Sequence, residues 1–305
     1  MSRLGRRCLG AAAGLVIDRV VGEPPADAHP VAEFGRVMKR VEQALWADRR
    51  LAGVAYTAVG VAIGTAGGRM MKSTATAVAI AAAGRELRRV AMCIGKAVAD
   101  DDLPAARTQL PTLVGRDPAE LNGSGIAAAV IESVAENSVD AVIAPAFWGA
   151  VAGAPGAAAY RAINTMDAMV GRRNERYRNF GWAAARLDDA ANYIPARVFA
   201  VLVAALSQAR ARQIVDAARL DAPAHPSPNA GVAEAAVAAA LDRKLGGPLS
   251  YEGVAEPRPF LGTGSRPDAG DIEATVRLAD RVEIAAVGLL VMVGTIDWLM
   301  DRSGG

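Results

Sequence analysis

The feature that most constrains this chain is a series of apolar segments, of which some have the length of a membrane-spanning helix and others are shorter apolar cores of helices. Ala141–Tyr160, Leu51–Gly68 and Val198–Leu206 contain no charged residue, and Ile284–Met300 contains a single one. A helix needs about 20 mostly apolar residues to cross a bilayer. Ser73–Gly84 adds a shorter apolar run. These segments predict four or five contacts with a membrane.

Helical periodicity runs through nearly the whole sequence, and no segment alternates like a strand. The predicted fold is all-α, a multi-pass helical integral membrane protein with interfacial helices, forming one domain over residues 1–305. The longest irregular stretch, Gly246–Asp271, is rich in Gly and Pro, and its length predicts a functional loop. The predicted helices are 8–21, 30–47, 51–67, 73–100, 103–113, 124–150, 157–170, 181–208, 208–219, 230–245 and 271–300.

Charge and motif content exclude several functional classes. Lys and Arg number 34 against 32 Asp and Glu, and the basic residues are scattered, so no nucleic-acid-binding face is expected. Cys8 and Cys93 lack metal-binding or redox spacing. No P-loop, dinucleotide-binding glycine motif or zinc-protease motif is present. Any nucleotide site must therefore be of a type that these motifs do not reveal.

The N-terminus allows a second interpretation. Arg3, Arg6 and Arg7 precede the apolar run Cys8–Ile17, and Ala26–Ala28 resembles a cleavage site. This is the layout of a signal peptide. The family resemblance described below includes residues on both sides of that point, so we expect the N-terminus to be retained.

Three acids form the sharpest candidate for chemistry. Glu132, Glu136 and Asp140 are spaced i, i+4 and i+8, which places them on one stripe of a helix. A solvated helix face would also give this pattern. Here the flanks are apolar on both sides, where acids are costly and usually functional. We therefore predict that the stripe is catalytic and binds Mg²⁺ or a substrate ammonium group.

The next helices carry further polar side chains on apolar backgrounds. Arg161, Asn164 and Asp167 follow one face at i, i+3 and i+6. They fit either substrate binding or an internal ladder of ion pairs. The following helix adds catalytic candidates Asp188 and Asp189 and the substrate-binding candidate Asn192.

The connection between these helices is strongly basic. Residues 172–178 contain four arginines in seven positions, together with Asn174. The segment fits a positively charged membrane anchor or a clamp for phosphate and carboxylate groups. Asn174 and Arg176 are the substrate-binding candidates here.

Both histidines precede proline, which restricts their backbone to extended or turn geometry. His29 is a substrate-binding candidate. His225 begins a proline-rich loop and is a catalytic candidate, with Asn229 and Glu234 as substrate-binding candidates beside it. Isolated histidines are more often packing or surface residues than catalytic ones, and that alternative stays open.

Taken together, these residues and the short sequence strings around them resemble the CobD/CbiB family of adenosylcobinamide-phosphate synthases. The matching strings occur in family order over about four-fifths of the chain, and the departures, such as Ala141 in place of glycine, remove no functional group. The strings are Asp18, Gly22–Pro24, His29–Val31, Gly35-Arg36, Val114–Asp117, Glu132–Asn137, Asp140, Ala144-Pro145, Phe147, Tyr160–Thr165, Asp167, Asn174–Tyr177, Phe180-Gly181, Arg186–Asp189, Asn192, Ile194–Arg197, His225–Gly231, Glu234-Ala235 and Leu245–Gly247.

The resemblance implies a multi-pass enzyme of the inner cell membrane that acts in cobalamin biosynthesis. It implies an acid–amine ligase that joins aminopropanol phosphate, or aminopropanol, to the propionate side chain of adenosylcobyric acid. ATP and Mg²⁺ are the implied cofactors. Membrane lipid and other late cobalamin-assembly enzymes are the implied partners. A small membrane transporter and a non-catalytic membrane scaffold for corrinoid enzymes remain as alternatives.

Overall fold

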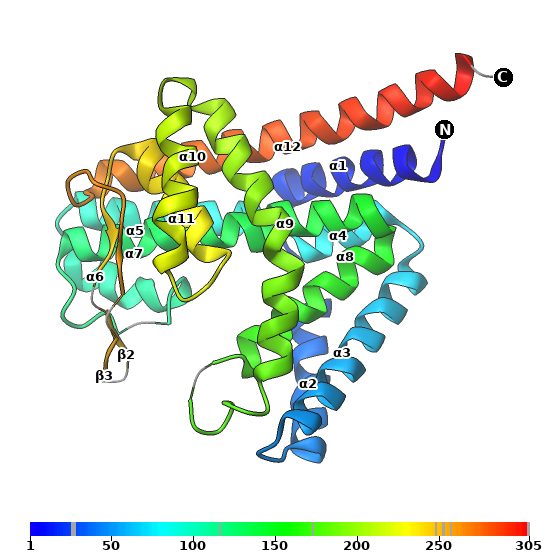
Figure 1. The fold of residues 1–305 in the computed structure, drawn as a ribbon, viewed down its shortest axis with the longest axis horizontal. Helices are drawn as coiled ribbons and strands as arrows, with labels where there is room; N and C mark the ends of the chain where they lie inside the picture. The colour runs from blue at the N-terminus through cyan, green and yellow to red at the C-terminus, as the bar shows by residue number, and fades with distance from the viewer. Residues whose placement is uncertain are drawn as a thin grey trace. The chain divides into compact units, whose positions relative to one another are not determined.

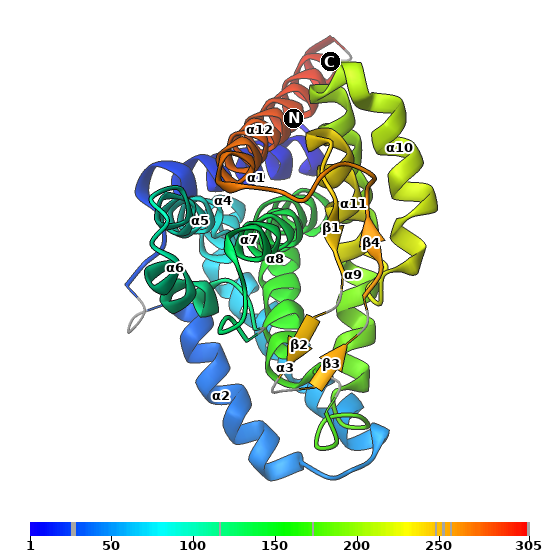
Figure 2. The same cartoon turned by 90° about the vertical axis from the view of Figure 1, so that its left-hand side faces the viewer.

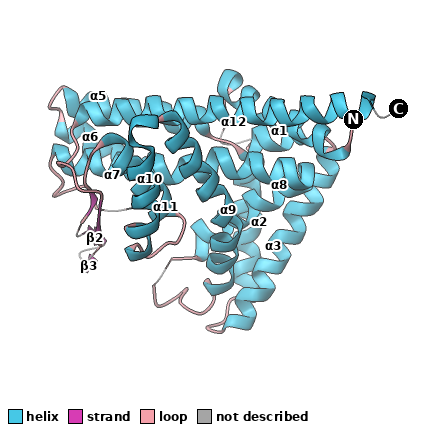
Figure 3. Ribbon diagram, turned by 45° about the horizontal axis from the view of Figure 1, so that its top comes forward, coloured by secondary structure: helices cyan, strands magenta, loops and turns pink. Residues whose placement is uncertain are grey.

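Helices make up almost the whole of the described chain, as Figure 3 shows, and confirm the all-α prediction. The computed structural model describes residues 1–25, 29–115, 117–172, 174–247, 249–251, 254–256 and 258–303. The α-helices are α1 (Arg3–Val21), α2 (Pro30–Leu45), α3 (Arg50–Met71), α4 (Thr74–Ala81), α5 (Gly84–Ala99), α6 (Leu103–Gln109), α7 (Gly123–Ser138), α8 (Ala144–Val170), α9 (Trp182–Leu206), α10 (Ala211–Leu220), α11 (Ala230–Leu241) and α12 (Ala269–Ser303).

Short elements complete the chain. A π-helical turn, η3 (Val139–Ile143), joins α7 to α8. The 3-10 turns are η2 (Leu110–Thr112), η4 (Gln208–Arg210) and η5 (Ala222–Ala224). The strands are β1 (Leu245–Gly246), β2 (Leu249–Tyr251), β3 (Val254–Glu256) and β4 (Phe260–Leu261).

Four helical segments of the described chain are long and apolar enough to cross a membrane. They are α3, the continuous run Gly123–Val170, α9 and α12. They contain Leu51–Gly68, Ala141–Tyr160, Val198–Leu206 and Ile284–Met300, so the prediction is confirmed for these four segments. The fifth segment forms α4, whose eight residues are too few to span a bilayer.

Three predictions of secondary structure were wrong. The helix expected over 230–245 ends at Leu241, and Leu245 lies in the strand β1. The helix expected over 73–100 is interrupted: Ala82 is extended and the Ala83 N–H donates to the Ala141 carbonyl at 3.0 Å, so a tertiary bond replaces a helical one. Gly246–Asp271, expected to contain no strand, includes the antiparallel pairs β1–β4 and β2–β3. Strands of two or three residues are too short to produce a detectable alternation. The proposed cleavage site at 26–28 lies outside the described residues.

The chain divides into two compact units. Unit 1 contains residues 1–83, 140–192 and 286–305, and unit 2 contains 84–139 and 193–285. In unit 1, α1, α4 and α8 pack side by side, and α3 packs along α8 (Figure 1). Gly60, Gly64 and Gly68 permit the close packing of α3 on α8, since a Cβ on Gly68 would lie 2.4 Å from the Ala154 carbonyl oxygen. Small residues at i and i+4 allow such close approach in membrane helices.

Helix α8 bends at Gly153. That residue has φ +71°, a left-handed value that glycine adopts without steric cost, and Pro155 follows two positions later. The Arg7 guanidinium donates to the Val151 carbonyl at 2.8 Å, next to the bend. The bend therefore divides the apolar segment Ala141–Tyr160 next to a backbone carbonyl that accepts a hydrogen bond from Arg7.

In unit 2, α7 packs against α5 and α11, and the strands β1 and β4 lie beside α11 (Figure 2). Every residue of α7 from Ile126 to Ala135 is buried. Arg88 on α5 forms an ion pair with Glu283 on α12, and Asp280 lies 3.6 Å away from the same guanidinium. This ion-paired group fastens α5 to the first part of α12.

Candidate active site

The densest polar cluster of unit 1 brings two carboxylates to one amide. The Asn164 side chain on α8 donates to Asp140 at 3.0 Å and to Asp188 at 3.4 Å. Asn192 donates to Asp188 at 3.0 Å, as their i, i+4 spacing on α9 allows. Four of the residues singled out from the sequence therefore meet in the structure. The amides fix the orientation of both carboxylates.

The backbone explains how Asp140 reaches this cluster. Asp140 lies in the π-helical turn between α7 and α8, and such turns frequently occur at functional sites. The Tyr160 hydroxyl, buried on α8, donates to the Asn192 side-chain oxygen at 2.8 Å and lies 3.2 Å from the Asp140 carbonyl oxygen. Sequence reasoning missed Tyr160 because a tyrosine in an apolar run resembles an ordinary core residue.

Arg161 extends the cluster along α8. One of its guanidinium nitrogens, Nη1, donates to the Asn164 side-chain oxygen at 3.3 Å. His29 caps the N-terminus of α2, where its Nδ1 accepts from the Val31 N–H at 3.2 Å. Burial and the positive charge of Arg161 lower the pKa of His29 below its usual 6.5. His29 is therefore neutral at pH 7 and close enough to Arg161 to sense its charge.

The predicted acidic stripe divides between the units. Asp140 belongs to unit 1, whereas Glu132 and Glu136 belong to unit 2. Glu132 is buried, and its carboxylate accepts from the Gly246 N–H at 2.7 Å, which fastens the start of the Gly246–Asp271 stretch to α7. Glu136 is exposed. The structure thus gives the three acids different surroundings, and their shared role stays a prediction.

The histidine loop forms a second polar group in unit 2. His225 Nε2 lies 3.7 Å from a Glu234 carboxylate oxygen, and both side chains are buried. Arg197 on α9 donates to the Asn229 side chain at 2.9 Å and to the Pro228 carbonyl at 3.2 Å. Three sequence candidates therefore lie in one loop and the helix that follows it.

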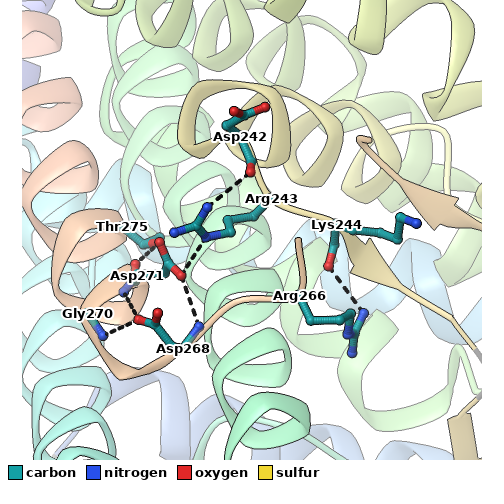
Figure 4. Close-up of polar contacts among 8 residues, drawn as sticks. All are labelled: Asp242, Arg243, Lys244, Arg266, Asp268, Gly270, Asp271 and Thr275. Atoms are coloured by element: carbon teal, nitrogen blue, oxygen red, sulfur yellow. Dashed lines mark hydrogen bonds and ion pairs between the residues drawn. The ribbon is translucent and has the colours of Figure 1, made fainter. Parts of the chain in front are cut away.

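The two ends of the Gly246–Asp271 stretch are fastened by polar contacts, shown in Figure 4. Arg243 donates to Asp271 at 2.7 Å, and the Asp268 N–H donates to the same carboxylate at 2.9 Å. Arg266 donates to the Lys244 carbonyl at 3.2 Å. The Asp271 carboxylate is stabilised by these hydrogen bonds and by its position in the first turn of α12, where a negative charge is favourable.

The other sequence candidates have local partners. Arg176 forms an ion pair with Glu42 at 3.1 Å and lies 4.8 Å from the Trp46 ring. The Asn174 side chain accepts from the Tyr177 N–H at 2.9 Å. Asp189 lies 3.6 Å from Arg186. Asp167 lies on α8, and its backbone carbonyl accepts from the Gly171 N–H. The phosphate role of Arg176 stays a prediction, and Arg173 of the same segment lies outside the described residues.

The acids of the chain suit one mode of Mg²⁺ binding. Within the described ranges, no group of three His, Cys, Asp or Glu side chains could hold a metal ion. Mg²⁺ often needs only one or two carboxylates, with waters and substrate phosphates as its other ligands. The Asp140–Asp188 pair fits that mode of binding, whereas a cage built from protein alone does not fit.

Comparison with known proteins gives consistent matches. The family model described as CobD/Cbib protein matches residues 11–279. A relative from Mycobacterium tuberculosis, "Cobalamin biosynthesis protein CobD", is 45% identical over 94% of this chain and 96% of its own length. Proteins of the same name from Chromobacterium violaceum and Stutzerimonas stutzeri are 42% and 40% identical, covering 88% and 93% of this chain and 90% and 96% of their own lengths. No solved structure matches the chain.

Proposed function

The chain belongs to the CobD/CbiB family, and from this premise we propose that it is an amide-forming ligase of cobalamin biosynthesis. The proposed reaction joins aminopropanol phosphate, or aminopropanol, to the propionate of adenosylcobyric acid at the expense of ATP. The four apolar helical segments support a location in the membrane, and we propose the inner cell membrane. The name of the relatives, cobalamin biosynthesis protein, supports the pathway, and the chemistry of the site supports the reaction.

The observation that carries the proposal is the Asp140–Asn164–Asp188 cluster. Amide formation from a carboxylate is uphill in water, so the carboxylate must first be activated, as in an acyl phosphate. Mg²⁺ would be held by Asp140 and Asp188, where it would screen the charge of the ATP phosphates. Two acids in apolar helices are costly without such a function.

The remaining residues of the cluster position the reactants. Asn164 and Asn192 fix the orientation of the carboxylates, and Tyr160 fixes Asn192. The substrate ammonium must first lose one proton, and Asp189, which follows Asp188 and is partly exposed, is the proposed acceptor of that proton. The amine nitrogen then forms the C–N bond while the acyl C–O bond breaks and phosphate leaves with the bonding electrons. The second proton of the nitrogen passes to the released phosphate.

The test is a reconstituted reaction with the purified, detergent-solubilised protein. Adenosylcobyric acid and Mg-ATP are supplied with either aminopropanol phosphate or aminopropanol, and the products are identified by mass spectrometry. We expect an amide product with one of the two amines and stoichiometric release of ADP or AMP. A transporter or a scaffold would form no covalent product, so the lack of product with both amines would reject the proposal.

A further inference from the structure

A narrow cleft opens in unit 1 between α2, α3, α4 and α8. Its volume is about 260 Å³, and apolar side chains such as Phe34 and Ile80 form most of its wall. Three polar residues, Glu33, Arg161 and Thr165, also line it. Glu33 accepts from Arg36, and the Thr165 hydroxyl donates to the Arg161 carbonyl. The guanidinium of Arg161 is therefore the strongest donor that the cleft offers to a ligand.

Two buried donors, one on a lining residue and one on the residue before the lining residue Pro30, lack an acceptor within the described part of the chain. They are Arg161 Nε and His29 Nε2. Because His29 Nδ1 accepts from a backbone N–H, the proton of the neutral ring must lie on Nε2. The nearest carboxylate oxygen, on Glu23, is 3.9 Å away, beyond hydrogen-bond distance. His29 immediately precedes Pro30 and Val31, which line the cleft.

Buried donors without acceptors are rare and costly, so they indicate an acceptor that arrives with a ligand. A guanidinium and an imidazole N–H together suit an oxyanion. The apolar wall requires that this oxyanion be attached to an apolar body. Of the reactants in the proposed reaction, the phosphates of ATP and aminopropanol phosphate carry no such body near the anion, whereas the corrinoid propionate does.

We propose that the Arg161 and His29 end of this cleft binds the carboxylate of the corrinoid substrate, with the adjoining apolar edge of the macrocycle in the cleft. This inference rests on the proposed function. The volume of the cleft is at the lower limit for small-molecule sites. The cleft can therefore accept the propionate side chain and the adjoining edge of the corrin macrocycle, but not the whole macrocycle. Arg161 also contacts Asn164, which places the bound carboxylate beside the two acids that would hold Mg²⁺.

A membrane lipid is a less suitable occupant. Helix α2, which forms one wall, exposes Arg36, Lys39 and Arg40 on its outer side. That charged face borders water or headgroups and not acyl chains. A substrate entering from the aqueous side is consistent with this arrangement.

The test measures binding directly, without ATP or amine. Equilibrium dialysis of the detergent-solubilised full chain, followed by corrinoid absorbance, compares adenosylcobyric acid with the same corrinoid whose propionate is a primary amide. We expect the acid to bind roughly ten- to a hundredfold more tightly, because it forms charged hydrogen bonds. Arg161→Gln should abolish this preference and leave the affinity for the amide unchanged. Arg40→Gln, at an exposed arginine of α2 that does not line the cleft, is the matched control and should retain the preference.

A second pair of variants tests the apolar wall. Gly67 lines the cleft, and a Cβ added there meets no atom within 4 Å, so Gly67→Leu fills the cleft without a backbone clash. It should weaken binding of both corrinoids about tenfold or more. Gly35→Leu on α2 has the same open surroundings but does not line the cleft, and should bind both normally.

Two results with the variants would overturn the inference: a preference for the acid that survives Arg161→Gln, or normal corrinoid binding by Gly67→Leu. A third would be corrinoid binding that shows no preference for the acid and that anionic phospholipid vesicles displace, because a lipid would then be the occupant of the cleft. The outcomes also separate this site from the proposed reaction. An Arg161-dependent preference without any amide product would reject the reaction and retain the site. Normal product formation without that preference would reject the site and support the reaction.

Discussion

Two pairs of carboxylates, one pair in each unit, have hydrogen-bond partners of different kinds. In unit 1, Asp140 and Asp188 accept hydrogen bonds from neutral asparagine amides. In unit 2, Glu283 is paired with Arg88, and Asp271 is paired with Arg243. A guanidinium neutralises its partner, whereas an amide orients a carboxylate and leaves its charge in place. This difference supports the proposal that Asp140 and Asp188 serve binding and chemistry, and that Glu283 and Asp271 serve stability.

The largest effect should follow removal of charge in unit 1. We expect Asp188→Asn, and separately Asp140→Asn, to lower kcat about a thousandfold, a loss typical of a group that stabilises charge in the transition state. The thermal unfolding temperature in detergent should change little, because asparagine has the size of aspartate and still accepts from Asn164. Initial rates and thermal unfolding are measured on the same preparation.

Asp242→Asn is the matched control, since Asp242 pairs with Arg210 at 3.1 Å on the surface of unit 2. Exposed ion pairs contribute little, so this variant should retain activity and stability. If Asp188→Asn instead retained its turnover and lost its stability, the two regions would not differ in the way we propose.

The next effect should be on stability, in unit 2. Glu283→Leu leaves the guanidinium of Arg88 buried without its main partner, and breaking a buried pair costs about 3 kcal/mol or more. The double variant Arg88→Met/Glu283→Leu should recover most of that loss, because it removes both charges. Specific activity per folded molecule should stay normal in both. A double variant as unstable as the single one would show that the pair itself is needed.

Glu132 tests whether an acid of unit 2 can also take part in the chemistry, because the sequence predicts a catalytic role for it. Its carboxylate accepts from the Gly246 N–H, and glutamine offers the same acceptor without charge. We expect Glu132→Gln to lose about 1 kcal/mol of stability and to keep turnover within a few-fold of the wild type. Glu132→Ala should lose more, because the buried N–H then has no acceptor. A hundredfold fall in kcat for Glu132→Gln at unchanged stability would assign Glu132 to the chemistry.

The sequence predicts most of the fold and part of the site, for physical reasons. The long apolar runs identify α3, α8, α9 and α12, because composition and length decide membrane insertion. Helical spacing links Asp188 to Asn192, but no local pattern could bring Asp140 to Asn164, which requires the packed α8 and the π-helical turn. The interruption at Ala82 and the anchoring of Glu132 by Gly246 are also tertiary effects.

The smallest predicted effect is a pH dependence that His29 contributes to unit 1. Burial and the charge of Arg161 lower the pKa of His29 in the folded protein, whereas in the unfolded chain it titrates near 6.5. Between these two pKa values the unfolded state binds more protons, so the free energy of unfolding falls as the pH falls below about 6.5 and levels off below the folded pKa. Protonation also removes the hydrogen bond that Nδ1 accepts from the Val31 N–H, which caps α2.

We expect the wild type to lose more thermal stability than His29→Gln between about pH 8 and about pH 5.5, with equal stability changes above about pH 7.5. The difference between the two proteins cancels the contribution of His225 and of the carboxylates. If His29→Gln showed the same acid-induced loss as the wild type, the neutral ring beside Arg161 would have no effect on folding.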